Sequence, residues 1–202
     1  RFAQRKNRTL VAFCGGRILC EKRDKFTDMV LDYGEPEPEA VGDLVEGCLK
    51  AGIAVNKLLL FVSEEDMPAV REEAETLFEG ECAITTAVPG MLEFLPLGAS
   101  KGAAVERLLR RLGVDAENVM ALGDGENDVE MLRLAGLGVA MAGSSPKVVD
   151  ACNGNVGLGN DENGVADAIE TYVLSTRGLA PASSMKIPEE EEEVEAVEVE
   201  VV

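Results

Sequence analysis

The stretch VMALGDGEND, residues Val119–Asp128, decides how the sequence folds. Its first five residues form a short apolar run typical of a buried parallel strand, and Asn127 can open the helix that follows. Asp124 therefore falls at the carboxyl end of a predicted strand, where α/β proteins collect their ligands. The pattern G-D-x-x-N-D is expected by chance in roughly one of a thousand chains of this length, so it indicates a functional site.

Strands and helices alternate on both sides of this motif. Ser100 is a good cap for a helix over Lys101–Leu112, and Gly113 ends it. Such alternation with short loops predicts a doubly wound α/β sheet, which we assign to residues 98–174. The other elements expected there are a helix over Asn127–Ala135, a strand over Gly138–Met141, a helix near Pro146–Ala151, a weak strand near Asn155–Leu158 and a helix over Gly164–Leu174.

The first half of the chain has a different rhythm. Its order β-β-α-α-β-α-β-β predicts an α+β unit over residues 1–97. The expected elements are a hairpin of Leu10–Phe13 and Arg17–Cys20, helices near Asp24–Leu31 and Ala40–Ala51 with a turn at Pro36 and Pro38 between them, a strand over Val55–Val62, a helix over Met67–Phe78, and strands over Cys82–Val88 and Met91–Leu95. Residues 175–202 have the composition of a disordered acidic tail.

The α/β piece has about three expected strands, and such a narrow sheet is a poor independent domain. We therefore interpret the chain, which opens with Arg1, as N-terminally incomplete.

Composition excludes several classes of protein. The 202 residues are 46% hydrophobic and 28% charged, as in a globular domain, and no apolar run is long enough for a membrane span. The net charge of −19 disfavours nucleic-acid partners. Five scattered cysteines and no histidine make structural zinc, a disulfide scaffold and histidine-activated nucleophiles improbable. Catalysis in this chain would depend on carboxylates, lysine and a hard metal ion.

Lys101 and Asp124 are expected on one rim of the sheet. A helix that begins at Lys101 starts at the carboxyl edge and returns as the strand that ends at Asp124. Such a rim suits Mg²⁺, which binds one or two carboxylates together with water and phosphate oxygens, while lysine supplies a point charge for phosphate. Taken singly, Asn127 and Glu130 could instead form a helix cap, and Lys101 could be a solvated surface residue.

The motifs also resemble a known family. Gly123–Asp128, preceded by Ala99–Gly102 and followed by Gly159–Ala166, resembles the C-terminal half of a haloacid dehalogenase (HAD) superfamily phosphatase of the Cof type, with a class IIB cap. Val88–Phe94 resembles the end of that family's cap domain. The resemblance implies the C-terminal half of a HAD-like doubly wound, Rossmann-like core in residues 98–174 and an α+β cap domain in residues 1–97.

The resemblance further implies Mg²⁺-dependent hydrolysis of phosphomonoesters through an aspartyl-phosphate. By position, Asp124 matches the carboxylate that binds Mg²⁺, and Lys101 matches the lysine that holds the phosphoryl oxygens. Asn127 matches a contact to the phosphoryl group. Asp128, which the resemblance places with both the catalytic and the metal-site residues, matches a supporting acid that orients Lys101 or the water shell of the metal. Glu126 occupies a variable position and has no implied role. The implied partner is a small phosphorylated metabolite such as a sugar phosphate, in the cytoplasm or a plastid.

The sequence departs from the family at the nucleophile. The family carries it in a D-x-D motif, and here no Asp is followed two positions later by another Asp. Cys14–Arg17 is only superficially similar to the family's Thr-Gly-Arg motif, since its context is a hairpin. We therefore expect a phosphatase as the parent protein and little activity in this chain alone. Two alternative functions stay open: a non-catalytic binding module derived from the family, and a HAD phosphomutase. The oligomeric state is also open.

Overall fold

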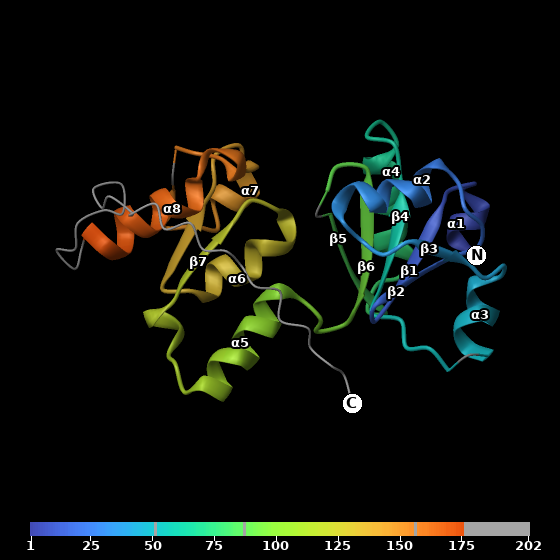
Figure 1. The fold of residues 1–202 in the computed structure, drawn as a ribbon, viewed down its shortest axis with the longest axis horizontal. Coiled ribbons are helices and arrows are strands. Elements are labelled where there is room, and N and C mark those ends of the chain that lie inside the picture. Colours follow the sequence, from blue (N-terminus) through green and yellow to red (C-terminus); the bar gives the residue numbers. More distant parts are fainter. Residues whose placement is uncertain (51, 87, 156, 176–202) are drawn as a thin grey trace, which may run out of the picture.

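The computed structural model describes residues 1–50, 52–86, 88–155 and 157–175, which form two sheets. A six-stranded sheet has the order β3-β2-β1-β4-β6-β5, and a three-stranded sheet has the order β7-β8-β9. Figure 1 shows two lobes joined by the segment that follows β6. We call them the six-stranded lobe, up to residue 97, and the three-stranded lobe, from residue 98 onward.

The six-stranded sheet is antiparallel except where β2 and β3 run parallel. Gly15, at φ 65°, makes the tight turn of the β1–β2 hairpin, a conformation that glycine adopts at no steric cost. The strands are β1 Leu10–Cys14, β2 Arg17–Cys20, β3 Pro38–Ala40, β4 Lys57–Phe61, β5 Cys82–Thr86 and β6 Met91–Pro96.

One prediction for this lobe is wrong. The sequence placed a turn at Pro36 and Pro38 and began the next helix at Ala40, whereas Pro38–Ala40 form the edge strand β3 and α3 begins at Leu44. Proline is tolerated as the first residue of an edge strand because it needs no partner for an N–H there. Pairing with β2, a contact between distant segments, overrides the local turn signal.

Helices cover one face of this sheet fully and the other in part. Side chains of α1 and α4 pack on Leu60, Leu92 and Phe94, and α3 packs on the same face near Ala12. On the opposite face, α2 and the 3₁₀ helix η1 pack near Phe61: the Phe26 ring lies 6.0 Å from the Phe61 ring, and Val30 belongs to a buried cluster with Val11, Ile18 and Met91. The helices are α1 Phe2–Arg5, α2 Lys25–Asp28, η1 Met29–Tyr33, α3 Leu44–Lys50 and α4 Met67–Leu77.

The three-stranded sheet is parallel, as the strand-helix alternation predicted. Ser100 caps α5 by accepting a hydrogen bond from the backbone N–H of Ala103 at 3.0 Å, and Gly113 ends the helix at φ 66°. The strands are β7 Met120–Gly123, β8 Leu137–Ala140 and β9 Gly154–Asn155. The helices are α5 Lys101–Leu112, η2 Ala116–Asn118, η3 Glu126–Asp128, α6 Val129–Leu134, α7 Pro146–Val149, η4 Asn160–Glu162, α8 Gly164–Ile169 and the π-helical η5 Glu170–Leu174.

Several expectations differ in extent from the structure. The weak strand near Asn155–Leu158 is the short β9, and residue 156 lies outside the described residues. The helix expected over Asn127–Ala135 begins instead with the 3₁₀ turn η3. Almost all of the expected acidic tail, residues 176–202, also lies outside the described residues. No helix of the described ranges has the length and apolar character to cross a membrane.

Candidate active site

The predicted rim brings Lys101 and Asp128 together. Lys101 begins α5, and Asp128 ends the turn that follows β7. The Lys101 Nζ donates to Asp128 Oδ1 at 2.5 Å, and the backbone N–H groups of Asp124 and Gly125 donate to Asp128 Oδ2 at 3.2 and 3.0 Å. Asp128 is only 4% exposed. Both oxygens of this buried carboxylate are therefore satisfied, and the carboxylate holds the lysine ammonium in place.

Two glycines permit this close packing. A Cβ on Gly123 would lie 2.6 Å from the Cβ of Asp128, and a Cβ on Gly102 would lie 2.6 Å from the Cβ of Glu130. Real Cβ atoms do not approach so closely, so neither position accepts a larger residue without a shift of the backbone. Gly102 lets α5 approach α6, and Gly123 lets the turn after β7 fold back on Asp128; together these contacts place Lys101 against Asp128.

Asp124 lies at the same edge with its side chain exposed to solvent. Its Oδ2 accepts a hydrogen bond from the Nδ2 of Asn160 in η4, at 3.0 Å. Asn160 lies in the Gly159–Ala166 motif, and the sequence alone assigned it no role. The signal that could have found it is topological, because η4 follows β9 and the carboxyl ends of parallel strands share one edge of the sheet.

The residues at this edge provide hard oxygen ligands of the kind Mg²⁺ takes. Within the described residues, no group of three or more His, Cys, Asp or Glu side chains is arranged to hold a metal ion. Both Asp128 oxygens are already hydrogen-bonded, whereas the exposed Asp124 carboxylate makes a single described hydrogen bond, through Oδ2. Asp124, with water and phosphate oxygens, fits a Mg²⁺ ion better than Asp128 does.

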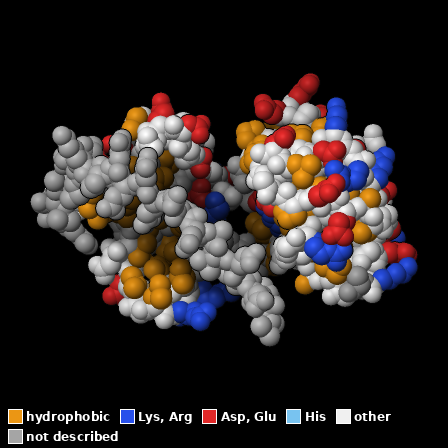
Figure 2. All heavy atoms as spheres, in the orientation of Figure 1, with side chains coloured by type: hydrophobic (Ala, Val, Ile, Leu, Met, Phe, Trp, Pro, Cys, Tyr) orange, Lys and Arg blue, Asp and Glu red, His pale blue; other side chains and the backbone are white. Residues whose placement is uncertain are grey.

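A cleft of about 870 Å³ lies between the two lobes and is lined by Lys101 and Asn127. Asp124 lies at the same edge but is not one of its lining residues. Basic and acidic side chains gather where the lobes face one another (Figure 2). The basic residues that line the cleft are Lys57, Arg71, Lys101, Arg107, Arg133 and Lys147. The acidic residues that line it are Glu35, Glu93, Glu126 and Glu130. This surplus of cations, in a chain of net charge −19, favours a small anionic ligand.

Glu126 connects the two lobes, a role that the sequence analysis did not assign. Arg71 of α4 donates two hydrogen bonds to its carboxylate, at 2.6 and 2.9 Å, and Lys147 of α7 donates a third. The hydrogen bonds from Arg71, reinforced by Lys147, lower the pKa of Glu126 to about 2, and the same contact raises the pKa of Arg71. Arg71 and Glu126 are 55 residues apart, so no local pattern points to this pair.

The similarity of Cys14–Arg17 to a family motif has no functional counterpart. The segment is the β1–β2 turn, as its hairpin context predicted. Arg17 pairs with Glu39 on β3, and Cys14 is buried beside Cys48; neither Cys14 nor Arg17 lines the cleft.

Comparison with known proteins finds relatives of much of the chain. A family model described as haloacid dehalogenase-like hydrolase matches residues 2–169. The chain is 39% identical over 167 residues to "Endoribonuclease YBEY, chloroplastic" of Arabidopsis thaliana, covering 82% of this chain and 28% of that protein. It is 43% identical over 94 residues to 5-amino-6-(5-phospho-D-ribitylamino)uracil phosphatase YcsE of Bacillus subtilis, covering 46% of this chain and 37% of that protein. The chain thus spans less than half the length of both relatives.

Solved structures share the fold. A haloacid dehalogenase-like hydrolase from Bacteroides thetaiotaomicron is 28% identical with a TM-score of 0.67, covering 84% of this chain and 63% of that one. A HAD subclass IIB sugar phosphatase is 22% identical with a TM-score of 0.69, covering 85% and 63%, a similarity that shows the fold alone. These matches confirm the predicted fold class, an α/β chain with a HAD-like Rossmann-type core. Since the family model covers far more than half of the sequence, the chain belongs to the haloacid dehalogenase-like hydrolases.

Proposed function

We propose that the protein carrying this chain is a Mg²⁺-dependent phosphomonoester hydrolase that acts on a small phosphorylated metabolite, with a sugar phosphate as the favoured class. The observation that carries the proposal is the Lys101–Asp128 pair, held beside Asp124 at the carboxyl edge of β7. Under this proposal residues 1–97 are the cap domain and residues 98–174 are the C-terminal half of the catalytic core.

Each residue of the edge has a distinct role in this proposal. The Lys101 ammonium binds phosphoryl oxygens and stabilises the charge that develops during transfer. Asp128 acts through Lys101, because its hydrogen bond fixes the ammonium, and the Asn127 amide donates to the phosphoryl group. Asp124, oriented by Asn160, would hold Mg²⁺, and the bound ion would supply polarisation of the phosphoryl group.

A covalent route also needs a nucleophilic carboxylate, and the sequence contains no D-x-D pair to supply one. We therefore propose that the 202 residues alone have little or no hydrolase activity and that the nucleophile comes from outside them. The ribonuclease name of the Arabidopsis relative is not a good guide to this region, because 38 acidic against 19 basic residues disfavour a polyanionic substrate. Its chloroplast designation supports a plastid over the cytoplasm as the compartment.

The test uses the full-length protein and measures phosphate released from ribose 5-phosphate, glucose 6-phosphate and p-nitrophenyl phosphate, with Mg²⁺ or with EDTA. We expect Mg²⁺-dependent release, and a loss of about 100- to 1,000-fold in kcat/KM for Lys101→Met. Lys50→Met is the matched control, since Lys50 lies on α3 and pairs only with the exposed Glu46 in the described structure. Equal activity of the two variants would refute the role of Lys101, and turnover by the 202 residues alone would refute the external nucleophile.

A further inference from the structure

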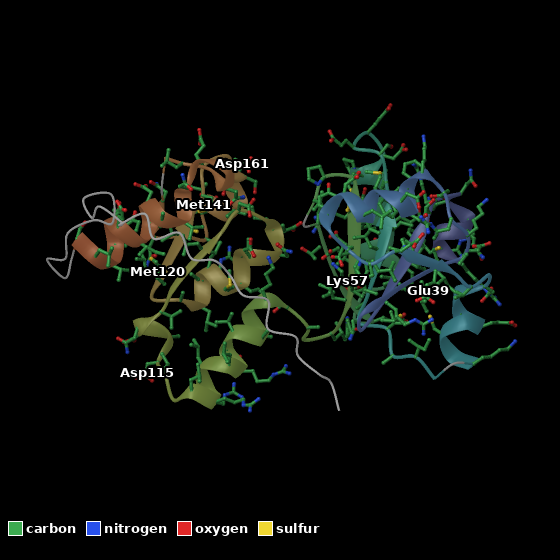
Figure 3. All side chains as sticks on the ribbon, viewed as in Figure 1. Glu39, Lys57, Asp115, Met120, Met141 and Asp161 are labelled. Atoms are coloured by element: carbon green, nitrogen blue, oxygen red, sulfur yellow. The ribbon has the colours of Figure 1, made fainter. Side chains whose placement is uncertain are left out.

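One end of the six-stranded sheet is open toward the cleft. Residues at odd positions of β4 and β6 share this face, and α2 and η1 pack on it near Phe61. At the other end, Phe13, Lys57 and Glu93 line the cleft directly. Figure 3 shows Lys57 on the side of its lobe that faces the three-stranded lobe, far from Glu39.

Lys57 and Glu93 form an ion pair within this apolar face. The Lys57 Nζ donates to Glu93 Oε1 at 2.7 Å and lies 4.5 Å from the centre of the Phe13 ring. Glu93 is 6% exposed, and the half-buried apolar side chains of Phe13 and Leu95 line the same cleft. Desolvating a carboxylate to this degree costs free energy that a single ion pair does not reliably offset. The position therefore points to a function rather than to stability.

The pair retains unused hydrogen-bonding capacity on the cleft side. A carboxylate accepts through two oxygens and an ammonium donates three hydrogens, yet in the described chain the only hydrogen bond of either side chain is the one between them. Glu93 Oε2 is not one of the fully buried unsatisfied atoms, so it keeps access to the cleft. An acceptor and a donor thus lie side by side on an apolar floor, across the cleft from Lys101 and Asn127.

We propose that Lys57 and Glu93 bind adjacent hydroxyl groups of the substrate's leaving group. A hydroxyl can accept from Lys57 and its neighbour can donate to Glu93, while the C–H face of a polyol or sugar packs on the apolar floor. The two charges cancel, so the subsite selects a neutral hydroxylated group and not a second phosphate. This inference rests on the proposed function, which places the phosphoryl group at Lys101.

The experiment compares a hydroxylated and a hydroxyl-free leaving group in the full-length protein. Substrates are ribose 5-phosphate, glucose 6-phosphate and glycerol 1-phosphate on one side and p-nitrophenyl phosphate on the other. For Glu93→Gln and Lys57→Met we expect kcat/KM to fall about 10- to 100-fold on the best hydroxylated substrate and to change less than about 2-fold on p-nitrophenyl phosphate. The control is Glu39→Gln, which breaks the exposed Arg17–Glu39 pair of the same sheet and should change neither value.

A double variant separates this effect from misfolding. Lys57→Met with Glu93→Met replaces both charges by apolar side chains, which keeps such a site folded, and its melting temperature is compared with that of the parent. We expect it to hydrolyse p-nitrophenyl phosphate normally and still to lose the hydroxylated substrates. Normal p-nitrophenyl phosphate turnover with no selective loss overturns the subsite alone. No turnover of any substrate by the parent protein overturns the proposed function and the subsite with it.

Discussion

The hydrogen bonds between Arg71 and Glu126 should hold the two lobes in their observed arrangement. Arg71→Ala removes both hydrogen bonds. The side chains of Arg71 and Glu126 are mostly shielded from solvent, with exposed fractions of 26% and 18%. Exposed pairs contribute about 0–1 kcal/mol, but removing a partly buried charge-assisted partner costs about 1.5–3 kcal/mol. A loss of that size shifts an equilibrium between closed and open lobes by about 10- to 150-fold.

Lys147→Ala is the matched control for this prediction. Lys147 binds the same Glu126 carboxylate, but both residues belong to the three-stranded lobe, so its loss leaves the contact between the lobes intact. Small-angle X-ray scattering of the full-length protein should give a larger radius of gyration for Arg71→Ala than for Lys147→Ala. Proteolysis next to Leu97, which is 61% exposed between the lobes, should also be faster in Arg71→Ala. Equal behaviour of the two variants would refute the reasoning.

The pH dependence of the same contact follows from the lowered pKa of Glu126. The pKa is 4.5 in the unfolded reference and about 2 in the folded state, so the carboxylate contributes stability above pH 4.5 and loses it as the pH falls toward 2. The lobes should therefore stay closed from neutral pH down to about pH 4.5 and open only in stronger acid. Opening between pH 5 and 7 would show that another group controls the contact.

The remaining predictions concern the proposed phosphoryl-binding edge, which is formed by Lys101, Asp124 and Asp128. Gly123→Ala should lower the free energy of unfolding by about 1–3 kcal/mol in chemical denaturation, because the added Cβ would overlap Asp128. Gly16 has open space around it, so Gly16→Ala should cost less than about 1 kcal/mol, and equal costs would contradict the packing argument. Asp128→Asn should reduce kcat by about 10- to 100-fold with little change in KM, since it loosens Lys101 without removing it; an effect on KM alone would argue against this positioning. Asp124→Asn should abolish the rise in melting temperature on adding Mg²⁺, and a persistent rise would place the ion elsewhere.

The local sequence predicted that Lys101, Asp124 and Asp128 share one edge of the sheet, because the elements that carry them are marked by local signals. Ser100 and Gly113 mark the ends of α5, and the apolar run before Asp124 marks β7. The rule that parallel strands expose their carboxyl ends at one edge then brings Lys101 to Asp128 without any knowledge of distant contacts. The prediction did not extend to Asp128's hydrogen bonds with two backbone amides, which depend on the tight turn after β7.

The parts that the sequence did not reveal depend on pairing between distant segments. Pro38–Ala40 form a strand because they pair with β2, and Lys57 contacts Glu93 because β4 and β6 are neighbours in the sheet. Glu126 stood in the most informative motif of the chain, yet its partner Arg71 comes from a helix of the other lobe. The sequence shows that these residues are charged, and its periodicity predicts where their elements begin. Neither contains information on strand register or on contacts between the lobes.

The proposed phosphoryl-binding edge lies wholly in the three-stranded lobe, so its geometry does not change when the lobes separate. The Lys57–Glu93 pair reaches the cleft from the other lobe, so its distance from Lys101 depends on the Arg71–Glu126 contact. Arg71→Ala should therefore raise KM for ribose 5-phosphate more than for p-nitrophenyl phosphate, which needs no hydroxyl contact. Equal increases would mean that the lobe contact and the hydroxyl subsite act independently.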